Sequence, residues 1–350
     1  MKAAVLHGNN DIRYEEMAKP EVGVNQVRVR VMTAGICGSD VPRVLNDGAH
    51  YYPIVLGHEF SGYVDAVGEA VEGLCTGDKV VGVPLKPCMA CSDCMKGNYS
   101  QCKHYSFVGS REQGAFADYV TLPAMNIVKI DDSVSYEQGA LFEPSTVALH
   151  GVKLSKLRAG KTAAILGGGT IGLLTAQWAR IFGAANVTVF DIDESRLDLA
   201  RRLGADNTIN SCDKDYIAQA KGVTGGKGFD YVFETAGVNV TSRSALTLAA
   251  NKGTVCLIGT PNADYTFGRD VWELILRKEL TLKGAWMSCS APFPGDEWTM
   301  TAHFFATGAL KYEEDLFYAK YHMCDAQKAF DLYQTPGQVK GRVLLYNEDK

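Results

Sequence analysis

The sequence contains no run of apolar residues long enough to cross a membrane as a helix. None approaches the roughly 18 consecutive apolar residues that such a span requires. Residues 1–7 hold one lysine and only a short apolar stretch, so they predict a strand rather than a signal peptide. We therefore expect a cytoplasmic protein that does not bind membranes.

The sequence also lacks an excess of positive charge. Its 35 lysines and arginines are outnumbered by 40 aspartates and glutamates, which gives a formal net charge of -5. This balance argues against nucleic acid as a partner, and no long run of one charge predicts a tail or a membrane surface. Repeats and low-complexity segments are not evident. With 350 residues and 46% hydrophobic content, the chain can form two domains with their own cores, and we expect it to act on a small molecule.

The pattern of the sequence changes near residue 150. Before this point, short β-rich runs such as 27–33 and 60–67 are interrupted by Gly, Pro and Asp, which is typical of an irregular β-barrel. After it, strands alternate with helices, which predicts a doubly wound parallel sheet. From about residue 290 the alternation ends, and we expect this segment to return to the first domain. The predicted strands of the second part are 162–166, 187–191, 231–234 and 254–258, and the predicted helices are 171–182, 195–203 and 242–248.

A glycine-rich turn follows the first of these strands. Gly167, Gly169 and Gly172 satisfy the spacing G-x-G-x-x-G, and a helical pattern begins at once. In such a motif the first glycine allows a tight turn, the second lets the backbone approach a pyrophosphate, and the third lets helix and strand pack closely. Thr170 and Ile171, at the start of the helix, complete the expected binding set, because a helix N-terminus attracts anions.

An acid at the end of the next strand favours NAD over NADP. Asp191 follows the glycines by about 20 residues, where a carboxylate can bind the ribose hydroxyls and would repel a 2′-phosphate. Arg196 is expected either to cover the adenine or to be an ordinary solvated helix residue. The alternative for the glycines, a plain turn, is disfavoured because strand, helix and acid all fit one motif.

Four of the ten cysteines are spaced as metal ligands. Their pattern is C-x2-C-x2-C-x7-C, formed by Cys88, Cys91, Cys94 and Cys102. Four thiolates can surround zinc completely and leave no position for substrate, so this spacing predicts a structural zinc site. An iron–sulfur cluster is the alternative, but a nicotinamide site indicates hydride chemistry rather than electron transfer. Disulfides are disfavoured because no export signal is present.

Residues for a second metal site are scattered through the sequence. Cys37, His58 and a carboxylate, either Glu59 or Glu143, would give zinc three protein ligands and leave the fourth position open for catalysis. Because these residues are far apart in the sequence, their spacing alone does not establish a metal site. A lone histidine is more often a satisfied core residue than a ligand.

The segment 57–71 (GHEFSGYVDAVGEAV) resembles the zinc signature of the medium-chain dehydrogenase/reductase family. Cys37, the four-cysteine cluster and the glycine loop occur in that family's order, and the resemblance spans essentially the whole chain. It implies an α/β protein with a GroES-like β-barrel catalytic domain at 1–147 and 290–350, which carries a zinc lobe at about 86–106. A Rossmann domain with a doubly wound parallel sheet is then expected at 148–289. The implied cofactors are two zinc ions per subunit and NAD.

Within the family, CGSD at 37–40, GHE at 57–59 and the pair Glu143–Pro144 resemble the sorbitol dehydrogenase branch, where a glutamate replaces the second zinc cysteine. Segments 48–53, 107–111 and 286–298 are similar to bacterial enzymes that act on galactitol 1-phosphate. The resemblance implies NAD-dependent oxidation of that polyol phosphate to tagatose 6-phosphate. Alternative substrates are sorbitol, xylitol or butanediol, and L-threonine dehydrogenases are more distant. The alternative from another class is a catalytically silent dinucleotide-binding protein.

The resemblance also assigns roles around the second zinc. Ser39 is expected to accept the proton of the substrate hydroxyl and pass it towards solvent or the cofactor ribose, unless it is a simple turn residue. Asp40 is expected to orient His58. Glu59 and Glu143 compete for the third ligand position, because two carboxylates beside a thiolate would give the site too much negative charge. Glu143 is the expected ligand in the resting enzyme.

A phosphorylated substrate requires a basic partner. The candidates, each of which could instead be a surface charge, are Arg43, His50, Arg111 and Lys278. Gly38 stands where many alcohol dehydrogenases carry a basic residue that binds pyrophosphate, so pyrophosphate binding must depend on the glycine loop and other donors. Residues 280–286 predict a strand where family members pair two sheets, so we expect a homodimer or homotetramer.

Overall fold

The computed structural model describes residues 1–261 and 263–348. The chain divides into two units, the first comprising Met1–Glu143, Cys289–Gly308 and Glu314–Lys350, and the second comprising Pro144–Ser288 and Ala309–Glu313. Across the described residues, every helix is too short or too polar to cross a membrane.

The unit boundaries differ by a few residues from those expected at 147 and 290, and side-chain contacts explain the difference. The indole nitrogen of Trp178 donates to Oγ of Ser145 at 3.0 Å, so residue 145 already packs within the second unit. The side chain of Gln177 exchanges hydrogen bonds with the backbone of Lys311, at 2.7 and 3.3 Å. The short stretch 309–313 therefore belongs to the second unit and not to the catalytic domain in which it was expected.

The first unit is organised around one long buried strand, β3 (Gln26–Ile36). It pairs in antiparallel fashion with β5 (Glu59–Val67), β9 (Tyr119–Pro123) and β18 (Arg342–Tyr346). The sheet order is β10-β6-β5-β3-β18-β17, with β9 also on β3. Alternating valines of β3 lie in a core that includes aromatic rings from distant segments. The other strands of this sheet are β6 (Lys79–Gly82), β10 (Ile127–Lys129) and β17 (Phe317–His322).

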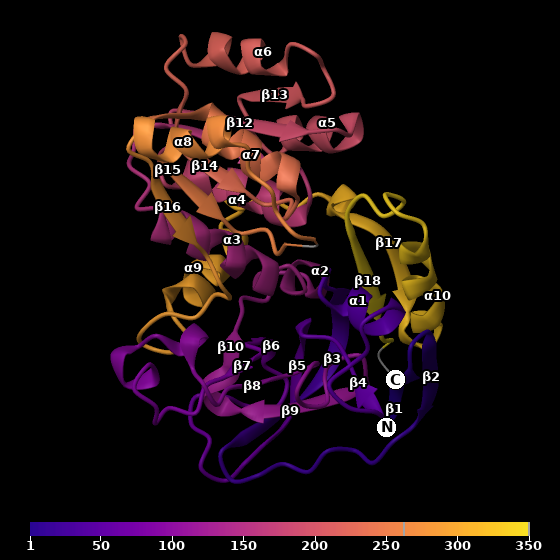
Figure 1. The fold of residues 1–350 in the computed structure, drawn as a ribbon. Helices are drawn as coiled ribbons and strands as arrows, with labels where there is room; N and C mark the ends of the chain where they lie inside the picture. Colours follow the sequence, from indigo (N-terminus) through magenta and orange to yellow (C-terminus); the bar gives the residue numbers. More distant parts are fainter. Residues whose placement is uncertain (262, 349–350) are drawn as a thin grey trace. The chain divides into compact units, whose positions relative to one another are not determined.

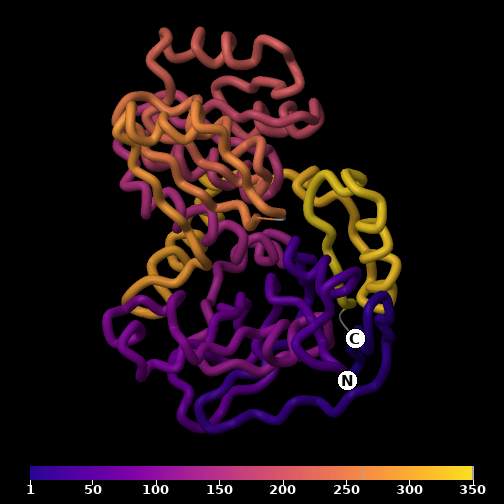
Figure 2. Tube along the Cα trace, viewed as in Figure 1, coloured from indigo at the N-terminus to yellow at the C-terminus, as the bar shows by residue number. Residues whose placement is uncertain are grey.

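Two smaller sheets complete the first unit, with orders β2-β1-β4 and β7-β8. The C-terminal segment lies beside the first strands (Figure 2), and there the amide of Ile12 donates to the side chain of Gln327. The strands are β1 (Lys2–Gly8), β2 (Asp11–Glu16), β4 (Ile54–Val55), β7 (Leu85–Lys86) and β8 (Ser106–Phe107). The helices are α1 (Asp40–Leu45), α2 (Tyr136–Gly139), α9 (Asp296–Ala306) and α10 (Ala326–Asp331), with 3-10 turns at Cys94–Lys96, Tyr99–Gln101, Ala124–Asn126, Glu314–Leu316, Met323–Asp325 and Leu332–Gln334.

The second unit is built on a six-stranded parallel sheet (Figure 1). Its order is β13-β12-β11-β14-β15-β16, so the first strand in the chain lies in the middle and the order reverses beside it. This is the doubly wound Rossmann order, and its ligand site lies at the carboxyl ends of the strands, where the order reverses. The predicted α/β class is confirmed. The strands are β11 (Thr162–Leu166), β12 (Asn186–Asp191), β13 (Asn207–Asn210), β14 (Phe229–Glu234), β15 (Ala249–Leu257) and β16 (Thr281–Gly284).

Helix α3 begins at the unit boundary and leads into β11, and the other helices of the second unit connect the parallel strands. The predicted helices at 171–182, 195–203 and 242–248 fall on α4, α5 and α7. The sequence did not predict α3, α6 or α8. The helices are α3 (Phe142–Leu154), α4 (Thr170–Ile181), α5 (Glu194–Arg202), α6 (Tyr216–Val223), α7 (Asn239–Leu248) and α8 (Arg269–Arg277).

Candidate zinc centres and dinucleotide site

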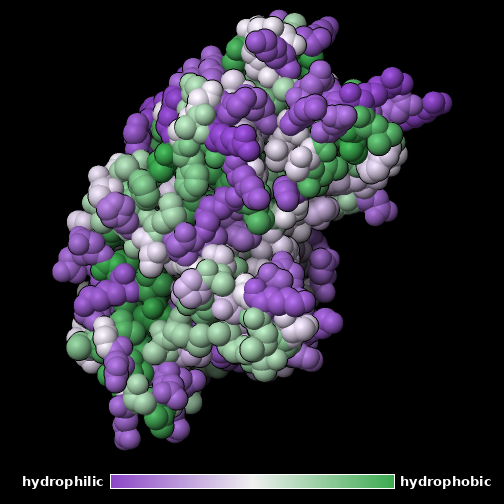
Figure 3. Space-filling view, turned by 90° about the vertical axis from the view of Figure 1, so that its left-hand side faces the viewer, coloured by the Kyte–Doolittle hydropathy of each residue, from purple (hydrophilic) through white to green (hydrophobic). Residues whose placement is uncertain are grey.

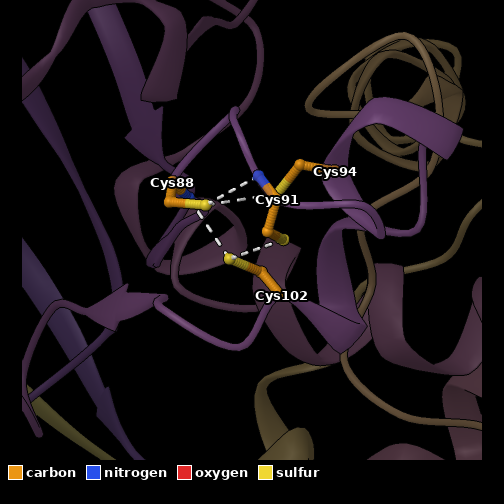
Figure 4. Close-up of side chains that lie close together, drawn as sticks. All are labelled: Cys88, Cys91, Cys94 and Cys102. Atoms are coloured by element: carbon orange, nitrogen blue, oxygen red, sulfur yellow. Dashed lines mark hydrogen bonds between the residues drawn. The ribbon is translucent and has the colours of Figure 1, made fainter.

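The four clustered cysteines converge on one point (Figure 4). All four sulfurs lie within 4.8 Å of one another, and the pairs Cys88–Cys94 and Cys91–Cys102 are each 3.9 Å apart. Four zinc–sulfur bonds of about 2.3 Å in a tetrahedron would place the sulfurs roughly 3.8 Å apart. The cluster therefore has the dimensions of a zinc site with four protein ligands.

Backbone amides of the same loop point at these sulfurs. The amide of Cys88 donates to Sγ of Cys102, and that of Cys91 to Sγ of Cys88, both at 3.3 Å. Backbone amides lower the pKa of the Cys88 thiol, and chiefly the amide of Cys94 lowers the pKa of Cys91 to about 6. Burial raises the pKa of Cys94 to about 12. A divalent cation would hold all four as thiolates, because metal ligation requires the deprotonated form.

The second cluster is assembled by the pairing of two strands. Cys37 follows the last residue of β3, and His58 precedes the first residue of β5. Because these strands are antiparallel neighbours with Gly35 opposite Glu59, the two ligand residues meet at one end of the sheet. The ligand atoms of Cys37, His58 and Glu59 lie within 4.8 Å of one another.

Glu59 is buried, and two neighbouring residues accommodate its carboxylate. A Cβ on Gly35 would lie 2.6 Å from Oε2 of Glu59, so only glycine leaves room for this group. Arg342 on β18 places Nη2 3.1 Å from Oε1 of Glu59 and donates to the carbonyl of Ile36. Within residues 1–261 and 263–348, neither oxygen of Glu59 has a partner in a well-directed hydrogen bond. Burial raises the pKa of Glu59, although Arg342 lowers it in part.

The donor set of the second cluster fits a cation. Burial and then the carboxylate of Glu59 raise the pKa of the Cys37 thiol. Burial lowers the pKa of Arg342, but the neighbouring Glu59 and Cys37 raise it more, so it stands above its usual value. One buried arginine balances only part of the negative charge that Cys37 and Glu59 carry as ligands. A divalent metal would satisfy the remaining charge and the oxygens of Glu59.

Asp40 lies behind the two ligands and is fully buried. Its Oδ2 accepts a hydrogen bond from the amide of Cys37 at 3.2 Å, and its Oδ1 lies 3.6 Å from Nδ1 of His58. That distance exceeds a hydrogen bond, and Nδ1 has no other partner among the described residues. Because Nδ1 faces Asp40, Nε2 is the ring nitrogen available to a metal, as the proposed orienting role of Asp40 requires.

Glu143 is placed nearby but outside the set of three. It lies in the first turn of α3 and is absent from the ligand atoms that meet within 4.8 Å. Burial, followed by the carboxylate of Glu59, raises its pKa to about 7. The two glutamates therefore interact electrostatically, and Glu59 is the one grouped with Cys37 and His58. Glu143 as the resting ligand stays a prediction.

The glycine loop in the second unit is shaped for close approach of a ligand. Gly167 follows β11 with φ +107°, a conformation that favours glycine. A Cβ on Gly172 would lie 1.8 Å from the carbonyl oxygen of Gly167, so no other residue fits there. A Cβ on Gly169 would meet nothing within 4 Å, which leaves open space before the helix. Thr170 and Ile171 begin α4, where amides have no intrahelical acceptor and can bind a pyrophosphate.

Asp191, at the carboxyl end of β12, lies against this loop. Its Oδ2 accepts from the amide of Gly168 at 2.6 Å, and its Oδ1 accepts from the amides of Ile192 and Asp193 at 2.8 and 2.9 Å. Nη1 of Arg196 lies 3.7 Å from Oδ2 of Asp191. The structure thus brings the predicted acid and arginine together beside the glycines, and Arg196 forms an ion pair there.

Two polar residues at the carboxyl end of β14, its last residue Glu234 and the following Thr235, were not predicted as part of this site. Oγ1 of Thr235 contacts the carbonyl oxygens of Leu166 and Gly167 at 3.0 Å. The buried carboxylate of Glu234 accepts from the amides of Ala236 and Gly237 at 2.9 Å. The signal was available, since polar residues that directly follow a strand of a doubly wound sheet lie at its ligand edge. A cavity of about 200 Å³ adjoins this edge, and its lining includes Glu234, Ile258, Thr260 and Trp286.

The four candidate phosphate partners have different surroundings. Arg111 is exposed and lies over the ring of Tyr105 at 4.7 Å, and His50 is exposed. Lys278 donates to three carbonyls where α7 ends and β15 begins, which is the amino edge of the sheet, opposite the glycine loop. This position disfavours Lys278 as a substrate ligand. Arg43 lies beside Ser39 in the first unit.

Comparison with known proteins agrees with this geometry. The alcohol dehydrogenase GroES-like domain model matches residues 23–132, and the zinc-binding dehydrogenase model matches residues 170–303. The chain is 40% identical over 347 residues to galactitol 1-phosphate 5-dehydrogenase of Escherichia coli (strain K12), covering 99% of each chain. It is 36% identical over 267 residues to sorbitol dehydrogenase of Bacillus subtilis (strain 168), covering 75% of this chain and 76% of that one.

A solved structure shows the same likeness in three dimensions. The crystal structure of galactitol-1-phosphate dehydrogenase from Escherichia coli matches with a TM-score of 0.92 at 39% identity, over 99% of this chain and 100% of that one. This chain belongs to the zinc-binding alcohol dehydrogenase family, the medium-chain dehydrogenases with GroES-like and Rossmann domains. It is an oxidoreductase that acts on CH–OH groups. The predicted family, fold and enzyme class are confirmed.

Proposed function

We propose that this protein oxidises a secondary hydroxyl of galactitol 1-phosphate to give tagatose 6-phosphate, with reduction of NAD. One observation carries the reaction type: Cys37, His58 and Glu59 meet within 4.8 Å in a buried cluster. The substrate is supported by the 40% identity to galactitol 1-phosphate 5-dehydrogenase over 99% of both chains. The likeness to sorbitol dehydrogenase favours an unphosphorylated polyol as the second candidate.

The residues of the first unit have complementary roles in this reaction. Cys37, His58 and one glutamate would hold the catalytic zinc, which supplies a Lewis acid that lowers the pKa of the substrate hydroxyl. Asp40 orients His58 and fixes the backbone of Cys37. Ser39 places its Oγ 3.3 Å from Sγ of Cys37, where it can take up the proton that the substrate hydroxyl loses and release its own towards solvent or the cofactor ribose.

The second unit would bind NAD, which accepts the hydride. The glycine loop and the start of α4 would bind the pyrophosphate of NAD, and Asp191 would bind the ribose hydroxyls. The cavity of about 200 Å³ beside Glu234 lies at the carboxyl edge of the sheet, so it is the proposed nicotinamide position. Since Asp191 would repel a 2′-phosphate, the expected cofactor is NAD rather than NADP.

The test uses the zinc-loaded protein with NAD or NADP and galactitol 1-phosphate, galactitol, sorbitol, xylitol or 2,3-butanediol. NADH should form fastest from galactitol 1-phosphate with NAD, and removal of zinc by a chelator should stop it. Faster oxidation of sorbitol or another unphosphorylated polyol would establish the second candidate. An absence of zinc-dependent NADH formation with every alcohol would favour a silent dinucleotide-binding protein.

The edge of the Rossmann sheet supports a further proposal, that two copies of the chain pair there. All four residues of β16 are exposed, and in the described residues this strand pairs with β15 alone. Large apolar side chains on β16 and its neighbours reach solvent, and hydrophobic surface is visible on this side of the second unit (Figure 3). They are Trp272, Leu276, Leu282 and Trp286.

Unpaired strand edges associate unless they are blocked, so the unmodified protein should sediment as a dimer or tetramer. Introducing charge by Leu282→Lys should shift it towards monomer. A monomeric unmodified protein at micromolar concentration would contradict this assembly.

A further inference from the structure

Ser39 occupies the N-cap position of α1 but does not cap the helix. A serine at this position ordinarily accepts a hydrogen bond from the amide of the second or third helical residue. Here the third residue is Pro42, which has no N–H, and the side chain of Ser39 makes no capping hydrogen bond. The backbone of Ser39 is also helical, with φ -75° and ψ -18°. Capping therefore does not account for this hydroxyl.

The hydroxyl of Ser39 instead lies between a candidate zinc ligand and an arginine. Its Oγ donates to Sγ of Cys37 at 3.3 Å and accepts from Nη1 of Arg43 at 3.0 Å. The same nitrogen donates to the carbonyl of Ser39 at 2.8 Å, so Arg43 binds the residue through both side chain and backbone. Because a hydroxyl has two acceptor lone pairs, one remains for a substrate hydroxyl.

Arg43 also connects Ser39 to the carboxylate behind the cluster. Nη1 of Arg43 lies 3.3 Å from Oδ1 of Asp40. Asp40 in turn accepts from the amide of Cys37 and faces His58. One arginine thus joins Ser39, the proposed proton relay, to the residue that orients both candidate ligands.

We propose that Arg43 is a positioning residue for Ser39 rather than a ligand of the substrate phosphate. A guanidinium does not release its proton in proteins, so Arg43 cannot itself receive the substrate proton. It holds the hydroxyl of Ser39 in one orientation, with a lone pair available to the alcohol. This role rests on the proposed dehydrogenase activity, and it replaces the phosphate-binding role that the sequence indicated for Arg43.

A double-mutant cycle on the zinc-loaded enzyme separates the two roles. Arg43→Ala should lower kcat for galactitol 1-phosphate by roughly 10–100-fold, the range typical for residues that support a metal site. In the Ser39→Ala background, the same change should cost less than about 2-fold, because residues that act through one another are not additive. Arg43→Lys should recover part of the loss. Zinc content and the KM for NAD should not change, and Arg13→Ala, at an exposed arginine on β2, is the matched control.

The contrary outcomes are distinct. An equal loss in both backgrounds, or a loss with galactitol 1-phosphate but not with galactitol, would overturn the positioning role and assign Arg43 to the phosphate. Loss of zinc in Arg43→Ala would show instead that Arg43 is needed for the cluster to hold its metal. If the unmodified enzyme oxidises a different polyol, the cycle is measured with that alcohol and only the substrate proposal falls. If it oxidises none, both proposals are wrong.

Discussion

Replacing Cys94 by serine is expected to remove one zinc ion per chain and to destabilise the first unit. Cys94 is a buried member of the four-sulfur cluster, so its loss leaves three thiols and an incomplete tetrahedron. Structural zinc contributes about 10–16 kcal/mol of binding free energy in small zinc-finger peptides, and this energy is coupled to folding. If only about 3 kcal/mol is lost here, the melting temperature of a domain of 150–250 residues should fall by roughly 6–12 °C.

Metal analysis and thermal unfolding of the same preparation measure this effect. Cys75→Ser is the matched control, since Cys75 is exposed and outside both clusters. It should keep two zinc ions and the unmodified melting temperature. A Cys94→Ser protein that retained two zinc ions and its melting temperature would show that the cluster does not hold structural zinc.

Replacing His58 by alanine is expected to abolish activity while leaving the structural zinc bound. His58 belongs to the cluster at the end of β3 and β5, and the four cysteines form a separate set. Loss of an outer partner of a metal ligand typically costs 10–100-fold, so loss of the ligand itself should lower kcat/KM by more than about 100-fold. NAD should still bind, because its proposed residues all belong to the second unit.

One zinc ion per chain and unchanged NAD affinity should therefore accompany the inactive protein. His303→Ala, at an exposed position of α9, should behave as the unmodified enzyme. Retention of both zinc ions and of activity in His58→Ala would remove His58 from the metal site. Loss of both zinc ions would mean that the two clusters do not form independently.

The Rossmann unit was predictable because its signals are local in sequence. The glycine loop, the following helix and the acid at the end of β12 lie within about 25 residues, the span of one strand–helix–strand unit. Two of the elements that escaped prediction, β13 and α6, have weak local signals. β13 is an edge strand of four residues in which only Ile209 is buried, and polar residues flank it. α6 buries a single residue, Ala220, so its pattern is also faint.

The sequence predicted the β-rich character of the first unit but not the arrangement of its site, because that site depends on pairing between distant segments. The sequence identified Cys37, His58 and two candidate glutamates, yet only the register of β3 against β5 shows that His58 and Glu59 lie beside Cys37. Arg342 was missed entirely. It reaches Glu59 because β18 pairs with β3, a contact that no local spacing reveals.

The comparison of one alcohol with and without its phosphate tests the central claim most directly. The measurement is kcat/KM of the zinc-loaded enzyme at saturating NAD for galactitol 1-phosphate and for galactitol. Two charge-assisted hydrogen bonds to the phosphate, at about 1.5–3 kcal/mol each, predict a preference of at least about 100-fold for the phosphorylated alcohol. Equal values, or faster oxidation of galactitol, would contradict the proposal that this enzyme acts on a polyol phosphate.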